Sequence, residues 1–167
     1  ELDRTMKQVD DAVQELSTAK TSTNNIMPRK NKKVQKVKTD LLGKINTLQG
    51  NLTTKQTKLR EAQRDFQIRR RRQPFDDART DEDAKKRVYE TMLTQSNGDL
   101  ANTTTTDATY TAAQEWLKAS ENAHKLAQQY DNFRAQNNFA YEGTTANHNT
   151  LLEEARKATS DAQSTHV

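Results

Sequence analysis

Apolar residues recur along this chain at steps of three and four, with about two apolar positions in every seven. Between residues 112 and 140 these steps alternate regularly, through Trp116, Leu126, Tyr130 and Phe133. This spacing places the apolar side chains in one narrow stripe along a helix. No segment shows the two-residue alternation of a half-buried strand. The sequence therefore predicts an all-α chain.

Few residues interrupt this pattern, because the chain contains only four glycines and two prolines. Pro28 suits the first turn of a helix, whereas the residue before Pro74 is disfavoured in the helical conformation. We interpret the segment around Pro74 as a turn, Thr80 as the next helix N-cap, and the threonine-rich residues 102–106 as a loop. We expect a single domain, 1–167, with helices at about 2–26, 29–72, 80–96, 107–141 and 145–163. In the alternative, the last two are one helix that continues through Gly143.

The supply of large apolar side chains is small. Leu, Ile, Val and Phe account for 26 of 167 residues, or about 16%. This share is below the roughly 20% under which a folded core becomes doubtful. This favours an elongated antiparallel helical bundle or coiled coil of three to four long helices, completed by self-association or a protein partner. No run approaches the roughly 18 apolar residues of a membrane span. The residues expected in the core seams are Leu41, Ile45, Leu48, Leu52, Leu59, Phe66, Trp116, Leu126, Tyr130 and Phe133.

The net charge of +4 hides a strong asymmetry along the chain. Residues 29–72 contain 15 Lys and Arg against 3 Asp and Glu, whereas the remainder contains 12 against 20. Acidic neighbours in the bundle neutralise such a helix, or it binds a polyanion such as a nucleic-acid backbone, anionic lipid or acidic surface polymer. Only Phe66 and Phe75 lie near these cations, so base stacking is not indicated. The candidate polyanion-binding residues are Arg29, Lys30, Lys32, Lys33, Lys36, Lys38, Arg69, Arg70, Arg71 and Arg72.

No motif points to catalysis, a cofactor or a metal. Glu121 and His124 have the spacing of di-iron ligands on a helix, but Thr145 stands where a matching glutamate would precede His148. The chain has no Cys, no glycine-rich phosphate loop and no recognisable nucleophile signature. We therefore expect no catalytic, cofactor-binding or metal-binding residue and no small-molecule substrate, with both histidines at the surface or its boundary.

These features favour a non-catalytic structural or adhesive subunit that works through protein–protein contacts. The alternative is a polyanion-binding protein that uses the basic helix 29–72. The chain begins at Glu1 without a Met. This favours a processed mature chain, extracellular or on a surface, over a segment excised from a longer protein.

Overall fold

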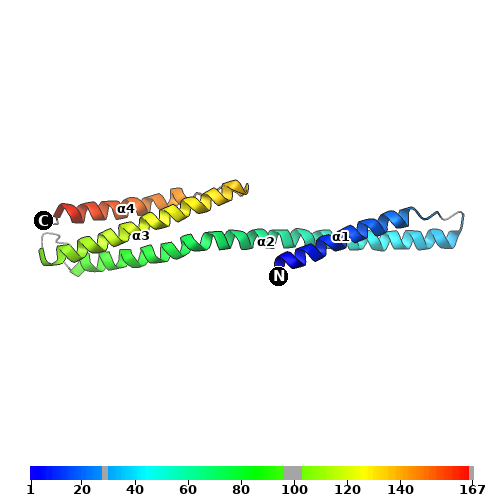
Figure 1. Ribbon diagram of the computed structural model, residues 1–167, viewed down its shortest axis with the longest axis horizontal. Helices are drawn as coiled ribbons and strands as arrows, with labels where there is room; N and C mark the ends of the chain where they lie inside the picture. The colour runs from blue at the N-terminus through cyan, green and yellow to red at the C-terminus, as the bar shows by residue number, and fades with distance from the viewer. Residues whose placement is uncertain (28–29, 96–102, 166–167) are drawn as a thin grey trace. The chain divides into compact units, whose positions relative to one another are not determined.

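The computed structural model describes residues 1–27, 30–95 and 103–165. These residues form four helices and no strand: α1 (Leu2–Asn24), α2 (Lys32–Gln95), α3 (Thr103–Gln136) and α4 (Thr144–Thr165) (Figure 1). The prediction of an all-α helical bundle is confirmed. None of the helices, over the residues described, is long and apolar enough to cross a membrane.

The chain divides into two compact units, and the division falls inside α2. The first unit is Glu1–Gln67 and the second is Ile68–Val167. Each unit has its own helix contacts, described in turn below. A single domain spanning the whole chain stays a prediction.

In the first unit, α1 lies antiparallel to the first part of α2. Gln63 Nε2 donates a hydrogen bond to Asp3 Oδ1 at 2.7 Å, near the start of α1. Lys38 Nζ donates to the backbone oxygen of Asn24 at 3.0 Å, at the end of α1. Because the order of contacts along α2 is reversed relative to α1, the two helices form a hairpin.

The start of α2 differs from the prediction. The helix begins at Lys32, three residues later than expected, because Asn31 supplies its cap. Asn31 Oδ1 accepts hydrogen bonds from the backbone N–H groups of Lys33 at 3.0 Å and Val34 at 3.3 Å. These bonds satisfy two of the amide groups that a helix leaves free at its N-terminus.

The largest correction concerns Pro74. The predicted turn there is wrong: α2 continues through it, and the two helices predicted on either side are one. An interior proline removes a helical hydrogen bond and costs about 3 kcal/mol. However, Phe75 and Ala78 follow directly and are buried against alanines of α3, and burying a phenylalanine returns about 1.5–3 kcal/mol. Thr80 lies inside the helix and donates to the carbonyl of Asp76 at 3.2 Å, so it is not an N-cap.

The predicted helix 107–141 is shifted along the chain, because α3 begins at Thr103 and ends at Gln136. Residue 102 of the predicted loop lies outside the described residues. The threonines of 103–106 belong to α3, which corrects the predicted loop for these residues. Residues 137–143 separate α3 from α4, so the alternative of one continuous helix is wrong. Gly143 has a φ of 69° and its carbonyl accepts the Asn147 N–H at 2.8 Å, in the first turn of α4. Glycine adopts a positive φ without the steric strain that a Cβ atom would cause, and this conformation changes the chain direction before α4.

The second unit packs the last part of α2 against α3 and α4 through small side chains. The buried ring of Trp116 lies 5.4 Å from the ring of Tyr89, between centroids, at the centre of one cluster. Alanine side chains are small and let neighbouring helices approach closely, so these helices bury a core although the chain has few large apolar residues. The buried alanines of α3 and α4 are Ala112, Ala113, Ala119, Ala123, Ala127, Ala155, Ala158 and Ala162.

The predicted core seam is buried unevenly. Ile45, Trp116 and Tyr130 are buried, and four more of these residues are half-buried, namely Leu52, Leu59, Leu126 and Phe133. The remaining three, Leu41, Leu48 and Phe66, are exposed, which corrects their assignment to the core of this chain. All three lie in the first unit, where the described residues supply only α1 to cover α2. One helix can bury only one side of another.

Candidate functional site

An apolar groove of about 210 Å³ lies in the first unit, where α1 ends and α2 begins. Its aliphatic lining comes from one residue after α1 and three on the first turns of α2. Two lysines complete it, and we call it the lysine-flanked groove. Its residues are Ile26, Lys33, Val34, Val37, Lys38 and Leu41.

The lysines around this groove have different roles. Lys38 Nζ donates to the backbone oxygens of Asn24 at 3.0 Å and Ile26 at 2.9 Å. A cation suits this place, because the last carbonyls of a helix lack partners and carry partial negative charge. Lys38 thus holds the segment after α1 against α2 and shapes the groove. The other described lysines of this cluster are exposed, namely Lys30, Lys32, Lys33 and Lys36, whereas Arg29 lies outside the described residues.

The second predicted basic cluster, Arg69 to Arg72, lies in the second unit and is partly engaged there. Arg72 is half-buried and forms ion pairs with Asp76 and Glu142, each at 3.2 Å. The Arg71 guanidinium lies 5.0 Å from the ring centroid of Phe133, a cation–π distance. Arg69 and Arg70 are exposed.

A buried polar cluster in the second unit was not predicted from the sequence. Its centre is Glu82 of α2, whose side chain is 1% exposed. Ser120 Oγ donates to Glu82 Oε1 at 2.7 Å, the Nε2 of His148 lies 2.7 Å from Oε2, and the Arg79 guanidinium also donates to Oε2. Burial alone would raise the pKa of Glu82, but these hydrogen bonds outweigh it and lower the pKa. We call these four residues the Glu82 cluster.

The Glu82 cluster contains a serine, a histidine and a carboxylate, but in a different order from a hydrolytic triad. In a triad the serine donates to the histidine, which the carboxylate orients from the other side. Here Ser120 donates directly to Glu82 and its side chain is fully buried. The arrangement is therefore that of a carboxylate held by three donors.

The two histidines of the described chain are in contact, because His124 lies next to His148 of the Glu82 cluster. The Nδ1 atoms of His124 and His148 lie 3.1 Å apart, and the ring centroids are 5.4 Å apart. His148 is 2% exposed, so its predicted surface position is wrong, whereas His124 is half-buried. We call them the histidine pair. No group of three or more potential metal ligands occurs in the described parts of the chain.

A periodicity signal for the buried polar residues was present in the sequence. Glu82 stands four and seven residues after Ala78 and Phe75, on their face of the helix. His148 likewise stands four and seven residues before Leu152 and Ala155. Residue type alone suggested exposed positions, because charged side chains are rarely buried unless they are paired.

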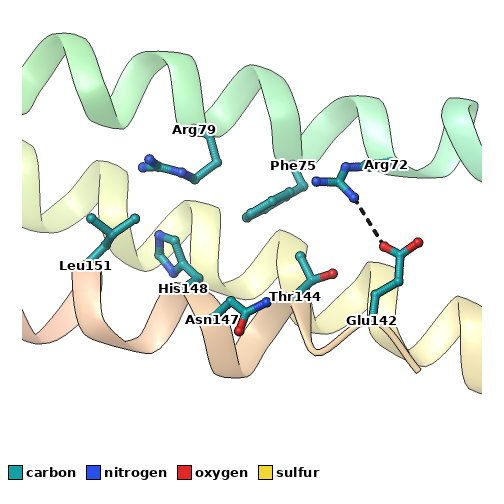
Figure 2. A pocket seen from close by; sticks show the side chains of 8 residues that line it. All are labelled: Arg72, Phe75, Arg79, Glu142, Thr144, Asn147, His148 and Leu151. Carbon is teal, nitrogen blue, oxygen red and sulfur yellow. Dashed lines mark hydrogen bonds and ion pairs between the residues drawn. The ribbon is translucent and has the colours of Figure 1, made fainter.

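A cavity of about 250 Å³ opens next to His148. Figure 2 shows Arg72, Phe75 and Arg79 projecting from α2 toward the start of α4, with Glu142 on the connection before it. Both arginines are already in ion pairs, Arg72 with Asp76 and Glu142, and Arg79 within the Glu82 cluster. The cavity therefore offers less positive charge to a ligand than its lining suggests.

A further set of polar contacts fixes the connection between α3 and α4. Buried Arg134 donates to the hydroxyl of Tyr130 at 3.0 Å and to the carbonyl of Ala140 at 2.8 Å, and pairs with Glu142 at 2.8 Å. The carbonyl of Ala140 lies in the non-helical connection and has no helical partner, so Arg134 supplies its hydrogen bond. Their role is structural.

The comparisons add no relative to this picture. No protein-family model, no curated protein and no solved structure matches the chain.

Proposed function

We propose that this chain is a non-catalytic structural or adhesive subunit that works through protein–protein contacts, with the lysine-flanked groove as its docking surface. The observation that carries the proposal is the exposure of aliphatic side chains there, which reaches 64% for Val37 and 41% for Leu41. Covering such a strip with another helix removes apolar surface from water and is favourable.

The partner we propose is an amphipathic helix of another protein, with carboxylates on both sides of its apolar stripe. The aliphatic lining of the groove fits the apolar stripe of such a helix. The surrounding charge fits the carboxylates, because residues 30–38 include five lysines and no Asp or Glu. A phosphate backbone would satisfy the lysines but would gain nothing from Val34 and Val37.

A second copy of this chain fits the groove less well. One acidic helix of the chain is α1, but its large apolar side chains are half-buried in the first unit. Another acidic stretch is the part of α2 from Asp76 to Glu90. The apolar residues of that stretch and its flank include Phe75, Ala78 and Tyr89, which are buried in the second unit. They are not free to fill a groove on another molecule.

The test uses a labelled synthetic peptide helix with leucines along one stripe and glutamates beside it. We expect the full chain to bind it in fluorescence anisotropy. Val37→Asp is expected to weaken binding by about tenfold or more, because it places a charge in the apolar contact. The control Thr39→Asp adds the same charge at an exposed neighbour that does not line the groove. Its affinity should stay within about threefold of the original chain.

Two outcomes overturn the proposal. One is no peptide binding, or equal losses for Val37→Asp and Thr39→Asp. The other is tight, strongly salt-dependent binding of a DNA duplex or anionic vesicles that Val37→Asp leaves unchanged, with no peptide binding. That second result would favour the polyanion-binding alternative.

A further inference from the structure

The histidine pair has a geometry that limits how many protons it can hold. The Nε2 of His148 lies 2.7 Å from a Glu82 oxygen. Since a carboxylate only accepts, this nitrogen carries its hydrogen. The other nitrogen of His148, Nδ1, faces the Nδ1 of His124 at 3.1 Å. Only one hydrogen fits between two nitrogens at that distance, with one as donor and the other as acceptor.

Proton counting defines the allowed states. The neutral pair carries two ring hydrogens, and one added proton makes three, which leaves one Nδ1 free to accept. A second added proton makes four, so both Nδ1 atoms carry hydrogens that point at each other. This conflict arises whichever ring takes the first proton.

The charges around the pair do not relieve this conflict. Glu82 of α2 is the nearest carboxylate, but the Arg79 guanidinium already shares it. Ser120 of α3 is neutral and donates to the same carboxylate. On the α4 side, Arg156 adds positive charge near His124. Burial, His148 and Arg156 together lower the pKa of His124, against a smaller opposing effect of Glu82.

We propose that the histidine pair makes the packing of α3 against α4 acid-sensitive, because the folded unit accommodates one added proton on the two rings and not a second. The unfolded chain has no such limit, and each histidine there takes a proton near pH 6.5. Well below that pH the unfolded chain therefore binds about one proton more than the folded unit. The pair is thus a pH-dependent contact between α3 and α4, and it shares no residue with the lysine-flanked groove.

The size of the effect follows from proton linkage. For each extra proton bound by the unfolded chain, the unfolding equilibrium constant rises about tenfold per unit fall in pH. The stability is complete above about pH 6.5 and is lost as the pH falls toward the lowered pKa of His124. Glu82 does not contribute in this window, because its pKa lies below its ordinary value of 4.5.

Trp116 provides a direct readout, because it is the single tryptophan of the chain and is buried in the same unit. We would follow urea unfolding of the full chain by its emission between about pH 7.5 and about pH 5. His124→Asn keeps an amide that can donate to His148 and removes one titrating ring. We expect the tenfold dependence of the original chain to fall below about threefold per pH unit. The control Glu121→Gln, exposed and one turn away, should keep the original dependence.

Nitrogen NMR of the histidine rings in the unsubstituted chain tests the same point without a variant. We expect the pair to take up one proton, not two, while Trp116 emission remains native. Two independent titrations near pH 6.5 with native emission would overturn the proposal. So would an equal pH dependence of stability in the original chain and His124→Asn.

Discussion

The ring of Phe75 on α2 meets the ring of His148 on α4 nearly at right angles, with centroids 6.0 Å apart. Phe75 is the residue that directly follows Pro74. The same contact therefore fixes α2 just beyond its proline and packs one side of the ring that holds Glu82. One aromatic side chain thus packs both against alanines of α3 and against the histidine of the Glu82 cluster.

Phe75→Ala should destabilise the second unit strongly. Phe75 is buried against alanines of α3 and against His148, and such truncations cost about 3–5 kcal/mol. Urea unfolding followed by Trp116 emission measures the loss. The matched control is Tyr141→Ala, at an exposed aromatic residue of the same unit, with an expected change below about 0.5 kcal/mol. Similar small effects at both positions would contradict the packing described for Phe75.

Pro74→Ala should stabilise the second unit, because α2 passes through this position as a helix. Alanine supplies the missing backbone N–H, which can donate to the carbonyl four residues earlier, and the gain is up to about 3 kcal/mol. The same urea experiment applies, and Gln73→Ala at the exposed neighbour should change the free energy of unfolding by less than about 0.5 kcal/mol. A loss of stability in Pro74→Ala would argue that the chain bends or breaks there.

Periodicity was enough to predict the fold class and the approximate place of α1, α3 and α4. It failed at Pro74, because local backbone preference disfavours a helix there while the burial of Phe75 and Ala78 favours one. That burial depends on Ala123 and Ala127 of α3, which lie more than 40 residues away in sequence. Single-sequence reasoning has no access to a contact of this kind.

The groove and the histidine pair could be predicted from the sequence to different extents. The excess of Lys around the groove could be read from one continuous segment of the sequence. The exposure of its apolar lining could not, because Leu41 was expected in a core seam. The Glu82 cluster joins residues from three helices, Glu82, Ser120 and His148. Their helical faces could be inferred from spacing, but their mutual distances depend on how the three helices pack.

Asp131→Asn should weaken the start of α4 in a pH-dependent way. The backbone N–H of Thr145 donates to Asp131 Oδ2 at 2.8 Å, at the positive end of the helix dipole. Burial alone would raise the pKa of Asp131, but hydrogen bonds from Thr145 and Thr144 outweigh it and lower the pKa. Removing the charge should cost about 0.5–1 kcal/mol at neutral pH.

The sign of this pH dependence is fixed by the lowered pKa. The contribution of Asp131 is present above its ordinary value of 3.8 and is lost as the pH falls through the lowered pKa. The difference between Asp131→Asn and the original chain in urea unfolding should therefore shrink below about pH 4. Glu115→Gln, an exposed substitution on the same helix, should show no comparable cost at neutral pH. A constant difference down to about pH 3 would contradict the role assigned to the Asp131 charge.

Glycine-to-alanine substitutions should have opposite effects at Gly143 and Gly50. At Gly143, φ is 69° and an added Cβ would lie 3.3 Å from Tyr141 Cε1. The left-handed conformation alone costs an alanine about 1–2 kcal/mol. At Gly50, inside α2, a Cβ meets nothing within 4 Å, and alanine should add up to about 1 kcal/mol of stability.

The two variants need different readouts, because Trp116 reports only on the second unit. Trp116 emission during urea unfolding measures the stability of Gly143→Ala, and circular dichroism of the folded protein measures its helix content. Circular dichroism of the helices during urea unfolding suits Gly50→Ala. If Gly143→Ala keeps full stability and gains helix signal, the break before α4 is not required by the fold. The alternative of one helix through residue 143 would then be favoured again, because alanine promotes it and glycine does not. A loss at Gly143 together with a gain at Gly50 supports both the break before α4 and the continuity of α2.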